Sequence, residues 1–317
     1  AMLGLEAAVA NSVKTGTKVL VIDNGVYGSG FASLVKMYGG KPVAMGLDWR
    51  RPVDPAAVER WLEREKDVEV VTLVHCDTPS ALYNPLRDVA KVVSDHGALL
   101  IVDAVSSIGA DEILFDEWRI GVLIGGSQKA LNAPPGLTIL AVSKAALDRA
   151  REVGRESFYM NYFVWEEWLE RGGFPYTMPD VLLYALKESL SKILEEGAPS
   201  VFQRHRAATL AARSAVEALG LKPYPECLEC TCPTATAFKT PISPNRLRSH
   251  IWEKYGVLLA GSWGPLENEL LRIGHMGVQA SPDHLATAVT ALAAGLRDFG
   301  VDVDVGRAID AVVEAFR

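Results

Sequence analysis

An aspartate and a lysine stand just after two apolar runs of this sequence, and side chains of these two types can work together in catalysis. Asp103 follows the run Ala98–Val102, and Lys129 follows Gly125-Gly126-Ser127-Gln128. A lysine with a lowered pKa can bond covalently to a carbonyl compound, and an aspartate facing it can hold a protonated pyridine nitrogen. The simpler alternative is a surface ion pair, which contributes only about 0–1 kcal/mol to stability.

The residues around Lys129 favour a ligand site over a surface ion pair. The run Gly125-Gly126-Ser127-Gln128 offers backbone N–H groups and two hydrogen-bonding side chains that suit a phosphate. The run Asn132-Ala133-Pro134-Pro135-Gly136 is a rigid turn that would fix the lysine backbone. Tyr27 could stack on a planar ring, or it could be an aromatic residue of the core.

The elements that would position these residues form a mostly parallel α/β sheet, because apolar runs alternate with amphipathic stretches. The expected strands are Lys18–Ile22, Pro42–Leu47, Val68–Val74, Ala98–Val102, Gly121–Ile124 and Leu137–Val142. The expected helices are Pro55–Glu65 and Pro85–His96, each with proline in its first turn. Ligands bind outside the carboxyl ends of such strands, where Asn24, His75, Asp77 and Asp103 are expected.

A second, smaller α+β unit is expected beyond a stretch from Phe158 to Pro179 that is rich in proline and aromatic residues. Its expected strands are Thr234–Phe238, Val257–Ala260 and Leu270–Ile273. The expected helices are Pro179–Glu196, Val201–Leu219, Asn245–Tyr255 and one that begins at Ser281-Pro282. We therefore predict a large domain over residues 1–197 and a small domain over residues 198–317.

Composition excludes several classes of protein. The 317 residues carry 32 Lys and Arg against 39 Asp and Glu, a net charge of −7, which disfavours a nucleic-acid partner or an anionic membrane surface. No apolar run approaches the roughly 20 residues that span a bilayer. There is also no pattern of a secretory signal. We expect a cytoplasmic protein without nucleic-acid or membrane partners.

The sequence has four cysteines, and three of them, Cys227, Cys230 and Cys232, are clustered. They could form part of a zinc site, but no fourth ligand stands at the usual spacing, so no metal is expected. Free thiols are the favoured interpretation, and a disulfide between two of the three is the alternative. We expect the cluster to lie outside the half of the chain that carries the active site.

Two long motifs resemble those of class V aminotransferases, in the branch of the alanine–glyoxylate and serine–pyruvate enzymes. They are Val102-Asp103-Ala104-Val105-Ser106-Ser107 and the run from Gly126 to Leu137 around Lys129. The similarity continues through His75-Cys76-Asp77-Thr78-Pro79-Ser80, Asn84-Pro85, Phe174-Pro175-Tyr176-Thr177 and Leu271-Arg272-Ile273-Gly274-His275-Met276-Gly277. The resemblance implies fold type I, with a mostly parallel central sheet covered by helices on both faces and a smaller C-terminal α+β domain.

The resemblance also implies pyridoxal 5'-phosphate as the cofactor, and it gives roles to individual residues. Lys129 would bond to the cofactor and move the substrate proton, and Asp103 would pair with the ring nitrogen. Arg272 would bind the substrate carboxylate. The other implied cofactor contacts come from Tyr27, Thr78 (or Ser80, if the loop alignment slips), Gln128 and Thr177. Thr177 would act from the neighbouring subunit, so the resemblance implies a homodimer with the active site at the subunit interface.

These residues predict transamination between a small amino acid, alanine or serine, and a 2-oxo acid, glyoxylate or pyruvate. The sequence also resembles the pyridoxamine–pyruvate branch, but Trp263 replaces a second substrate-binding arginine of that branch and would narrow the substrate pocket. A cysteine desulfurase or lyase on the same fold is also compatible with the sequence, and so is a non-catalytic subunit. Family members have further sequence ahead of Leu3, so we expect their amino-terminal segment to be absent here.

Overall fold

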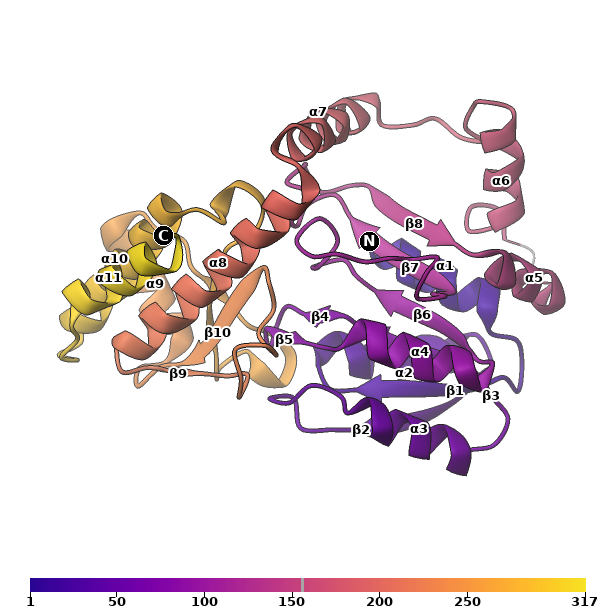
Figure 1. Cartoon of the computed structure of the whole chain (residues 1–317), viewed down its shortest axis with the longest axis horizontal. Coiled ribbons are helices and arrows are strands. Elements are labelled where there is room, and N and C mark those ends of the chain that lie inside the picture. Colours follow the sequence, from indigo (N-terminus) through magenta and orange to yellow (C-terminus); the bar gives the residue numbers. More distant parts are fainter. Residues whose placement is uncertain (155–156) are drawn as a thin grey trace.

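The largest element of the computed structural model, which describes residues 1–154 and 157–317, is a six-stranded sheet, called here the large sheet. Its strands are β1 (Lys18–Asp23), β2 (Lys41–Gly46), β3 (Val68–Val74), β6 (Leu99–Asp103), β7 (Val122–Gly126) and β8 (Thr138–Val142). They lie in the order β2-β1-β3-β6-β7-β8, all parallel except β8, which pairs antiparallel with β7 (Figure 1). The mostly parallel sheet predicted from the sequence is confirmed.

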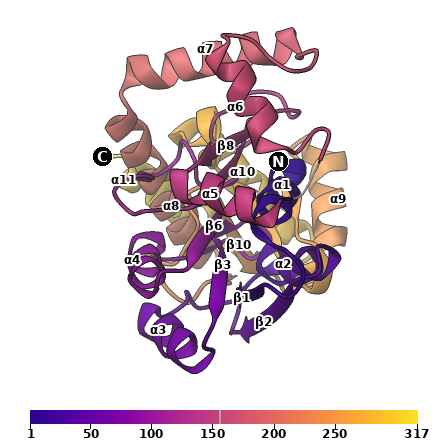
Figure 2. The ribbon, with the colours of Figure 1, turned by 90° about the vertical axis from the view of Figure 1, so that its right-hand side faces the viewer.

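Helices cover both faces of the large sheet. They are α1 (Met2–Ser12), α2 (Val26–Met37) and α5 (Lys144–Val153) on one face, and α3 (Pro55–Arg64) and α4 (Leu86–His96) on the other (Figure 2). Successive side chains of a strand point to opposite faces, so Val19 and Val21 pack with the first group and Leu20 and Ile22 with the second. Burial on both faces explains why these strands are continuous apolar runs.

The C-terminal part contains a second sheet, called here the small sheet. It consists of β9 (Lys222–Pro223), β10 (Ala235–Lys239), β11 (Ala260–Gly261) and β12 (Leu271–Gly274), in the order β11-β12-β10-β9 with antiparallel neighbours. A separate apolar core packs against it from α8 (Ala198–Ala218), α9 (Pro244–Tyr255), α10 (Pro282–Asp298) and α11 (Val305–Ala315). The boundary between residues 197 and 198 stays a prediction.

Two helices lie at one end of the molecule, beyond β8 (Figures 1 and 2). They are α6 (Tyr162–Glu170) and α7 (Asp180–Glu196). No residue of α7 is buried, and Val181, Tyr184 and Leu194 are 80%, 72% and 77% exposed. A helix that has several apolar residues and buries none of them is unusual, because helices are mostly stabilised by packing an apolar face.

The expected elements match within a few residues, with one exception. The strand expected at Val257–Ala260 is wrong, because only Ala260 and Gly261 pair with β12. Residues 257–259 follow the left-handed Gly256 at the end of α9. The helices that were not anticipated include α2, α5, α6 and α11. The side chains of Ser143, Asn161 and Asp304 cap three of them, and these caps were the available signal.

Candidate active site

Asp103 is the last residue of β6, and its side chain is buried at the carboxyl end of the large sheet. One carboxylate oxygen accepts a hydrogen bond of 2.9 Å from the backbone N–H of Val105. Burial raises the pKa of Asp103 to about 6, and the nearby charge of Lys129 opposes that rise. A carboxylate in this environment is stabilised by any cation that comes within reach.

Lys129 lies in the loop that follows β7, beside β6, and is half-buried. Burial and the nearby charge of Arg272 lower the pKa of its amine, while Asp103 raises it. The loop is held by the Ser127 hydroxyl, which donates a 2.7 Å hydrogen bond to the Pro134 carbonyl. A lysine in a rigid loop with a lowered pKa is suited to bond to a carbonyl carbon.

Asp77 is fully buried in β4 (Cys76–Asp77), which forms a hairpin with β5 (Leu82–Tyr83). It accepts a 2.9 Å hydrogen bond from the backbone N–H of Tyr27. A Cβ atom at Gly25 would lie 2.3 Å from the Asp77 side chain, so this contact requires glycine. Asp77 therefore fixes Tyr27 at the same edge of the sheet, a role that the sequence did not indicate.

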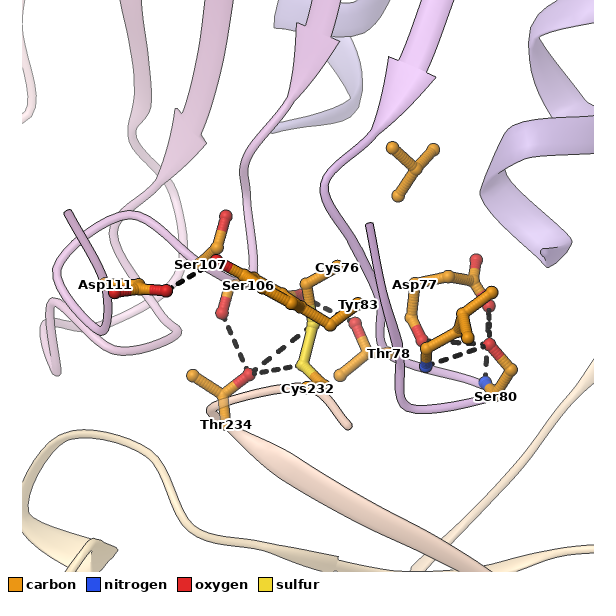
Figure 3. The surroundings of a disulfide bond; sticks show 12 residues. Cys76, Asp77, Thr78, Ser80, Tyr83, Ser106, Ser107, Asp111, Cys232 and Thr234 are labelled. Atoms are coloured by element: carbon orange, nitrogen blue, oxygen red, sulfur yellow. Dashed lines mark hydrogen bonds between the residues drawn. A yellow bond between two sulfur atoms is a disulfide. The ribbon is translucent and has the colours of Figure 1, made fainter. Parts of the chain in front are cut away.

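The two hydroxyl candidates of the β4–β5 loop differ in their contacts. The Thr78 hydroxyl lies 2.6 Å from the hydroxyl of Ser106, in the segment that follows Asp103. The Ser80 hydroxyl donates a 2.7 Å hydrogen bond to the Asp77 carboxylate and is fully buried (Figure 3). The sequence predicts no individual role for Ser106, and its contact with Thr78 becomes visible only in the fold.

Arg272 reaches the same region from β12 of the small sheet. Its Nε and Nη2 donate to the Gly261 carbonyl at 2.8 and 2.5 Å, and its Nη1 donates to the Thr78 carbonyl at 2.6 Å. These contacts use three of the five N–H groups of a guanidinium, which leaves two for a carboxylate. Burial lowers the pKa of Arg272, whereas the charges of Tyr27 and Asp77 raise it.

Tyr27 and Trp263 form an aromatic pair next to Arg272. Their ring centroids are 5.7 Å apart at an interplanar angle of 75°, and Trp263 is 50% exposed. Burial, followed by the charges of Asp103 and Asp77, raises the pKa of Tyr27 to about 12, while Arg272 lowers it. Tyr27 is therefore close enough to the two buried carboxylates and to the arginine to feel the charges of all three.

The structure brings all but one of the predicted site residues to this edge. Gln128 is half-buried beside Gly126, whereas Thr177 is exposed in the loop between α6 and α7. Within residues 1–154 and 157–317, no three His, Cys, Asp or Glu residues could hold a metal ion. The same ranges contain no helix that is both long and apolar enough to cross a bilayer.

The preferred interpretation of the cysteines is wrong, because all four form disulfides. Cys227 pairs with Cys230, and Cys232 pairs with Cys76 at a sequence separation of 156. The cluster is also not remote from the active site, since Cys76 is two residues from Thr78. Sequence spacing could not reveal this pairing, because the fold alone brings residues 76 and 232 together.

The residues of the site fit pyridoxal phosphate. Oε1 of Gln128 is buried with no hydrogen-bond partner in the described part of the chain, and a half turn of the amide would present Nε2, a donor suited to phosphate oxygens. Asp103 offers a buried carboxylate for a ring cation, and Lys129 offers an amine for an aldehyde. Tyr27 supplies an aromatic face next to them.

Comparison with known proteins agrees with this geometry. The family model described as aminotransferase class-V matches residues 4–220, so the chain belongs to that family. It is a pyridoxal-phosphate-dependent aminotransferase of fold type I.

Two relatives and one solved structure show the extent of the similarity. Pyridoxamine–pyruvate transaminase of Mesorhizobium japonicum is 34% identical, over 98% of this chain and 81% of the relative. Serine–glyoxylate aminotransferase of Methylorubrum extorquens is 32% identical, over 98% of this chain and 80% of the relative. The crystal structure of pyridoxamine–pyruvate aminotransferase from Mesorhizobium loti superposes with a TM-score of 0.95 at 33% identity, covering 99% of this chain and 82% of that one.

Proposed function

We propose that this aminotransferase moves the amino group of alanine or serine to glyoxylate or pyruvate. The observation that carries the proposal is the arrangement of Arg272, with two N–H groups left for a carboxylate, beside Lys129 and the bulky Trp263. A guanidinium that binds the carboxylate orients the Cα atom of a 2-amino acid. An indole beside it restricts the side chain of that acid to a small group.

The cofactor, when bound, supplies an electron sink for the charge that develops at the substrate Cα atom. The residues of this chain supply binding, orientation and proton transfer. Asp103 would hold the ring nitrogen in its protonated form, because a buried carboxylate stabilises a nearby cation. The amine of Lys129, whose pKa is lowered, would take the proton from the substrate Cα atom and return it to the cofactor side.

Three further residues would hold the cofactor. Tyr27 would stack on the ring, Gln128 would bind the phosphate, and Thr78 would bind the phenolic oxygen. Thr78 is favoured over Ser80 for this contact, because the Ser80 hydroxyl already donates to Asp77. A fourth residue, Thr177, would reach the phosphate of the neighbouring subunit.

We propose a homodimer in the cytoplasm as the working form. The exposed apolar residues of α7, namely Val181, Tyr184 and Leu194, support an interface at this end of the molecule. Thr177 lies three residues before α7. A second subunit that covers α7 would therefore bring Thr177 close to the interface as well.

Pyridoxamine–pyruvate transamination is the second candidate, since a relative with that name is 34% identical. Trp263 disfavours this candidate, because it stands at the position where that branch has its second substrate-binding arginine, and an indole cannot replace the guanidinium. A cysteine desulfurase needs a free nucleophilic thiol, and every cysteine of the chain is disulfide-bonded.

The test is a panel that pairs alanine, serine and pyridoxamine with glyoxylate and pyruvate, using the chain loaded with pyridoxal phosphate. We expect the highest kcat/KM with alanine or serine as donor. A higher kcat/KM with pyridoxamine would overturn the proposed donor in favour of the second candidate. Absence of transfer with every pair, together with sulfide release from cysteine, would overturn it in favour of a desulfurase.

A further inference from the structure

The disulfide between Cys76 and Cys232 joins the β4–β5 hairpin, which follows β3 of the large sheet, to the segment that leads into β10 of the small sheet (Figure 3). Cys76 lies in β4, and Cys232 lies three residues before β10 of the small sheet. Both side chains are buried, and their Cα atoms are 5.6 Å apart. The bond is a covalent connection, additional to the peptide chain, between the loop that carries Thr78 and the sheet that carries Arg272.

Non-covalent contacts accompany this bond, and we call residues 76–83 and 230–234 together the junction. The backbone N–H of Tyr83 donates to the Cys230 carbonyl at 2.9 Å, and that of Cys232 donates to the Ala81 carbonyl at 2.8 Å. The Thr234 hydroxyl donates to the Ser106 carbonyl at 2.8 Å and lies 3.1 Å from Sγ of Cys232 (Figure 3). The junction thus connects the small sheet to the segments that follow β3 and β6.

The junction sets the position of the arginine relative to the cofactor loop. Arg272 donates to the Thr78 carbonyl at 2.6 Å, two residues from the disulfide, and the Ser262 hydroxyl donates to the Pro79 carbonyl at 2.8 Å. Hydrogen bonds of this kind open and re-form individually, because each is far weaker than a covalent bond. A disulfide keeps the two sides together until it is reduced.

We propose that the Cys76–Cys232 disulfide is a redox-controlled cross-link that holds Arg272 in position to bind substrate. This inference rests on the proposed function. A dithiol reductant supplies the two electrons. One of its thiolates attacks a sulfur of the pair and forms a mixed disulfide, and its second thiolate then displaces the remaining cysteine. The reductant ends as a disulfide, and Cys76 and Cys232 end as thiols that have taken up two protons.

The second disulfide offers a matched control within the same chain. Cys227 and Cys230 are three residues apart in one loop, so their bond does not connect the two sheets. Cys227 is half-buried, whereas Cys76 and Cys232 are 3% and 0% exposed. A reductant should therefore reach Cys227–Cys230 first, and Cys76–Cys232 only when the junction opens.

The experiment compares the enzyme loaded with cofactor, before and after dithiothreitol, with the variants Cys76→Ser/Cys232→Ser and Cys227→Ser/Cys230→Ser. Dithiothreitol is removed by gel filtration without oxygen, and thiols are counted with a chromogenic disulfide reagent. We expect the fully reduced enzyme and the first variant to show a KM for alanine raised about tenfold or more, with kcat changed far less. Amide hydrogen exchange of the junction should become faster in both, and the second variant should behave as the wild type.

Two results would overturn the proposal. One is an unchanged KM and unchanged exchange in an enzyme with four free thiols. The other is an equal rise of KM in the Cys227→Ser/Cys230→Ser variant. Hydrogen exchange is also measured on the cofactor-free chain. The effect of the Cys76–Cys232 cross-link on the junction is therefore tested even if alanine is not a substrate. If the Cys76→Ser/Cys232→Ser variant does not fold, the KM and the hydrogen exchange of the fully reduced wild type test the proposal.

Discussion

The edge of the large sheet and strand β12 of the small sheet contribute to the same site in different ways. On the large sheet, Asp103 is the last residue of β6 and Lys129 follows the neighbouring parallel strand β7, and main-chain pairing of Asp103 with Ile124 fixes the position of the aspartate. On the small sheet, the guanidinium of Arg272 is positioned by carbonyls of Gly261 and Thr78, of which the second lies in the β4–β5 loop that follows β3 of the large sheet. The two groups proposed for the chemical step are therefore positioned within one sheet, and the proposed substrate-binding arginine by contacts between two parts of the chain.

Because the two regions contribute differently, substitutions in them should affect different kinetic parameters. Burial at the large sheet shifts the pKa values of Asp103 and Lys129, so substitutions there should act on the chemical step. Contacts between the sheets position Arg272 and Trp263, so substitutions there should act on the binding and choice of substrate. If substitutions in both regions lowered the rate of the chemical step equally, this division of roles between the two regions would be wrong.

Removing the amine on the large-sheet side is the most severe test. Lys129→Ala is expected to lower turnover by about 10³-fold or more, because the group that we propose moves the proton is lost. Some cofactor binding should remain through the other contacts, visible in the absorption spectrum. Lys91 is exposed on α4, so Lys91→Ala is the control and should leave turnover unchanged. Undiminished transamination by the Lys129 variant would refute its assigned role.

Asp103 gives a pH test of burial on the same side. Its pKa is raised to about 6, so the folded, cofactor-free protein binds this proton more tightly than the unfolded chain does. The protonated Asp103 carboxyl therefore contributes fully to the free energy of unfolding below about pH 4. This contribution, about 3 kcal/mol, is lost as the pH rises through about 6. The free energy of unfolding of the wild type relative to Asp103→Asn should fall by that amount between these pH values.

Urea unfolding at several pH values measures this difference. Asp310 is exposed on α11, and Asp310→Asn should follow the wild type across the range. A difference between the wild type and Asp103→Asn that stays constant with pH would show that the carboxyl group is not desolvated. Burial would then not explain why the large-sheet side should act on the chemical step.

On the small-sheet side, Arg272→Lys should raise the KM for the amino acid about 10- to 100-fold, because one point charge replaces a bidentate donor. The kcat value should change much less. Steady-state kinetics at varied donor concentration separates the two parameters, with Arg246→Lys on the surface of α9 as the control. A loss confined to kcat would place Arg272 in the chemical step and remove the distinction between the regions.

The smallest effect is expected at Trp263. Trp263→Ala should improve kcat/KM for a donor one or two methylene groups longer than alanine, relative to alanine, by about tenfold. The ratio of the two kcat/KM values measures this effect. Trp252, 52% exposed on α9, provides the control Trp252→Ala, for which the ratio should not change. An unchanged ratio in the Trp263 variant would mean that the indole does not limit the substrate side chain.

Much of the large-sheet side could be predicted because its signals are local. Apolar runs of strand length, prolines in the first turns of helices and the motif around Lys129 each lie within a few consecutive residues. The strand expected at Val257–Ala260 failed for a non-local reason, since a strand exists only where a partner pairs with it. The contact of Asp77 with the Tyr27 backbone also depends on a close approach at Gly25 that no local pattern encodes.

The order of apolar and polar residues was enough to predict the mostly parallel sheet, and it made Asp103 and Lys129 candidates for a site at the carboxyl ends of its strands. Folding alone decided that Cys76 meets Cys232, that Thr78 meets Arg272, and that the pKa of Asp103 rises. Strand and helix periodicities arise from neighbouring residues and can be read along the chain. Burial and contacts between distant segments depend on how the whole chain packs, so they become visible only in three dimensions.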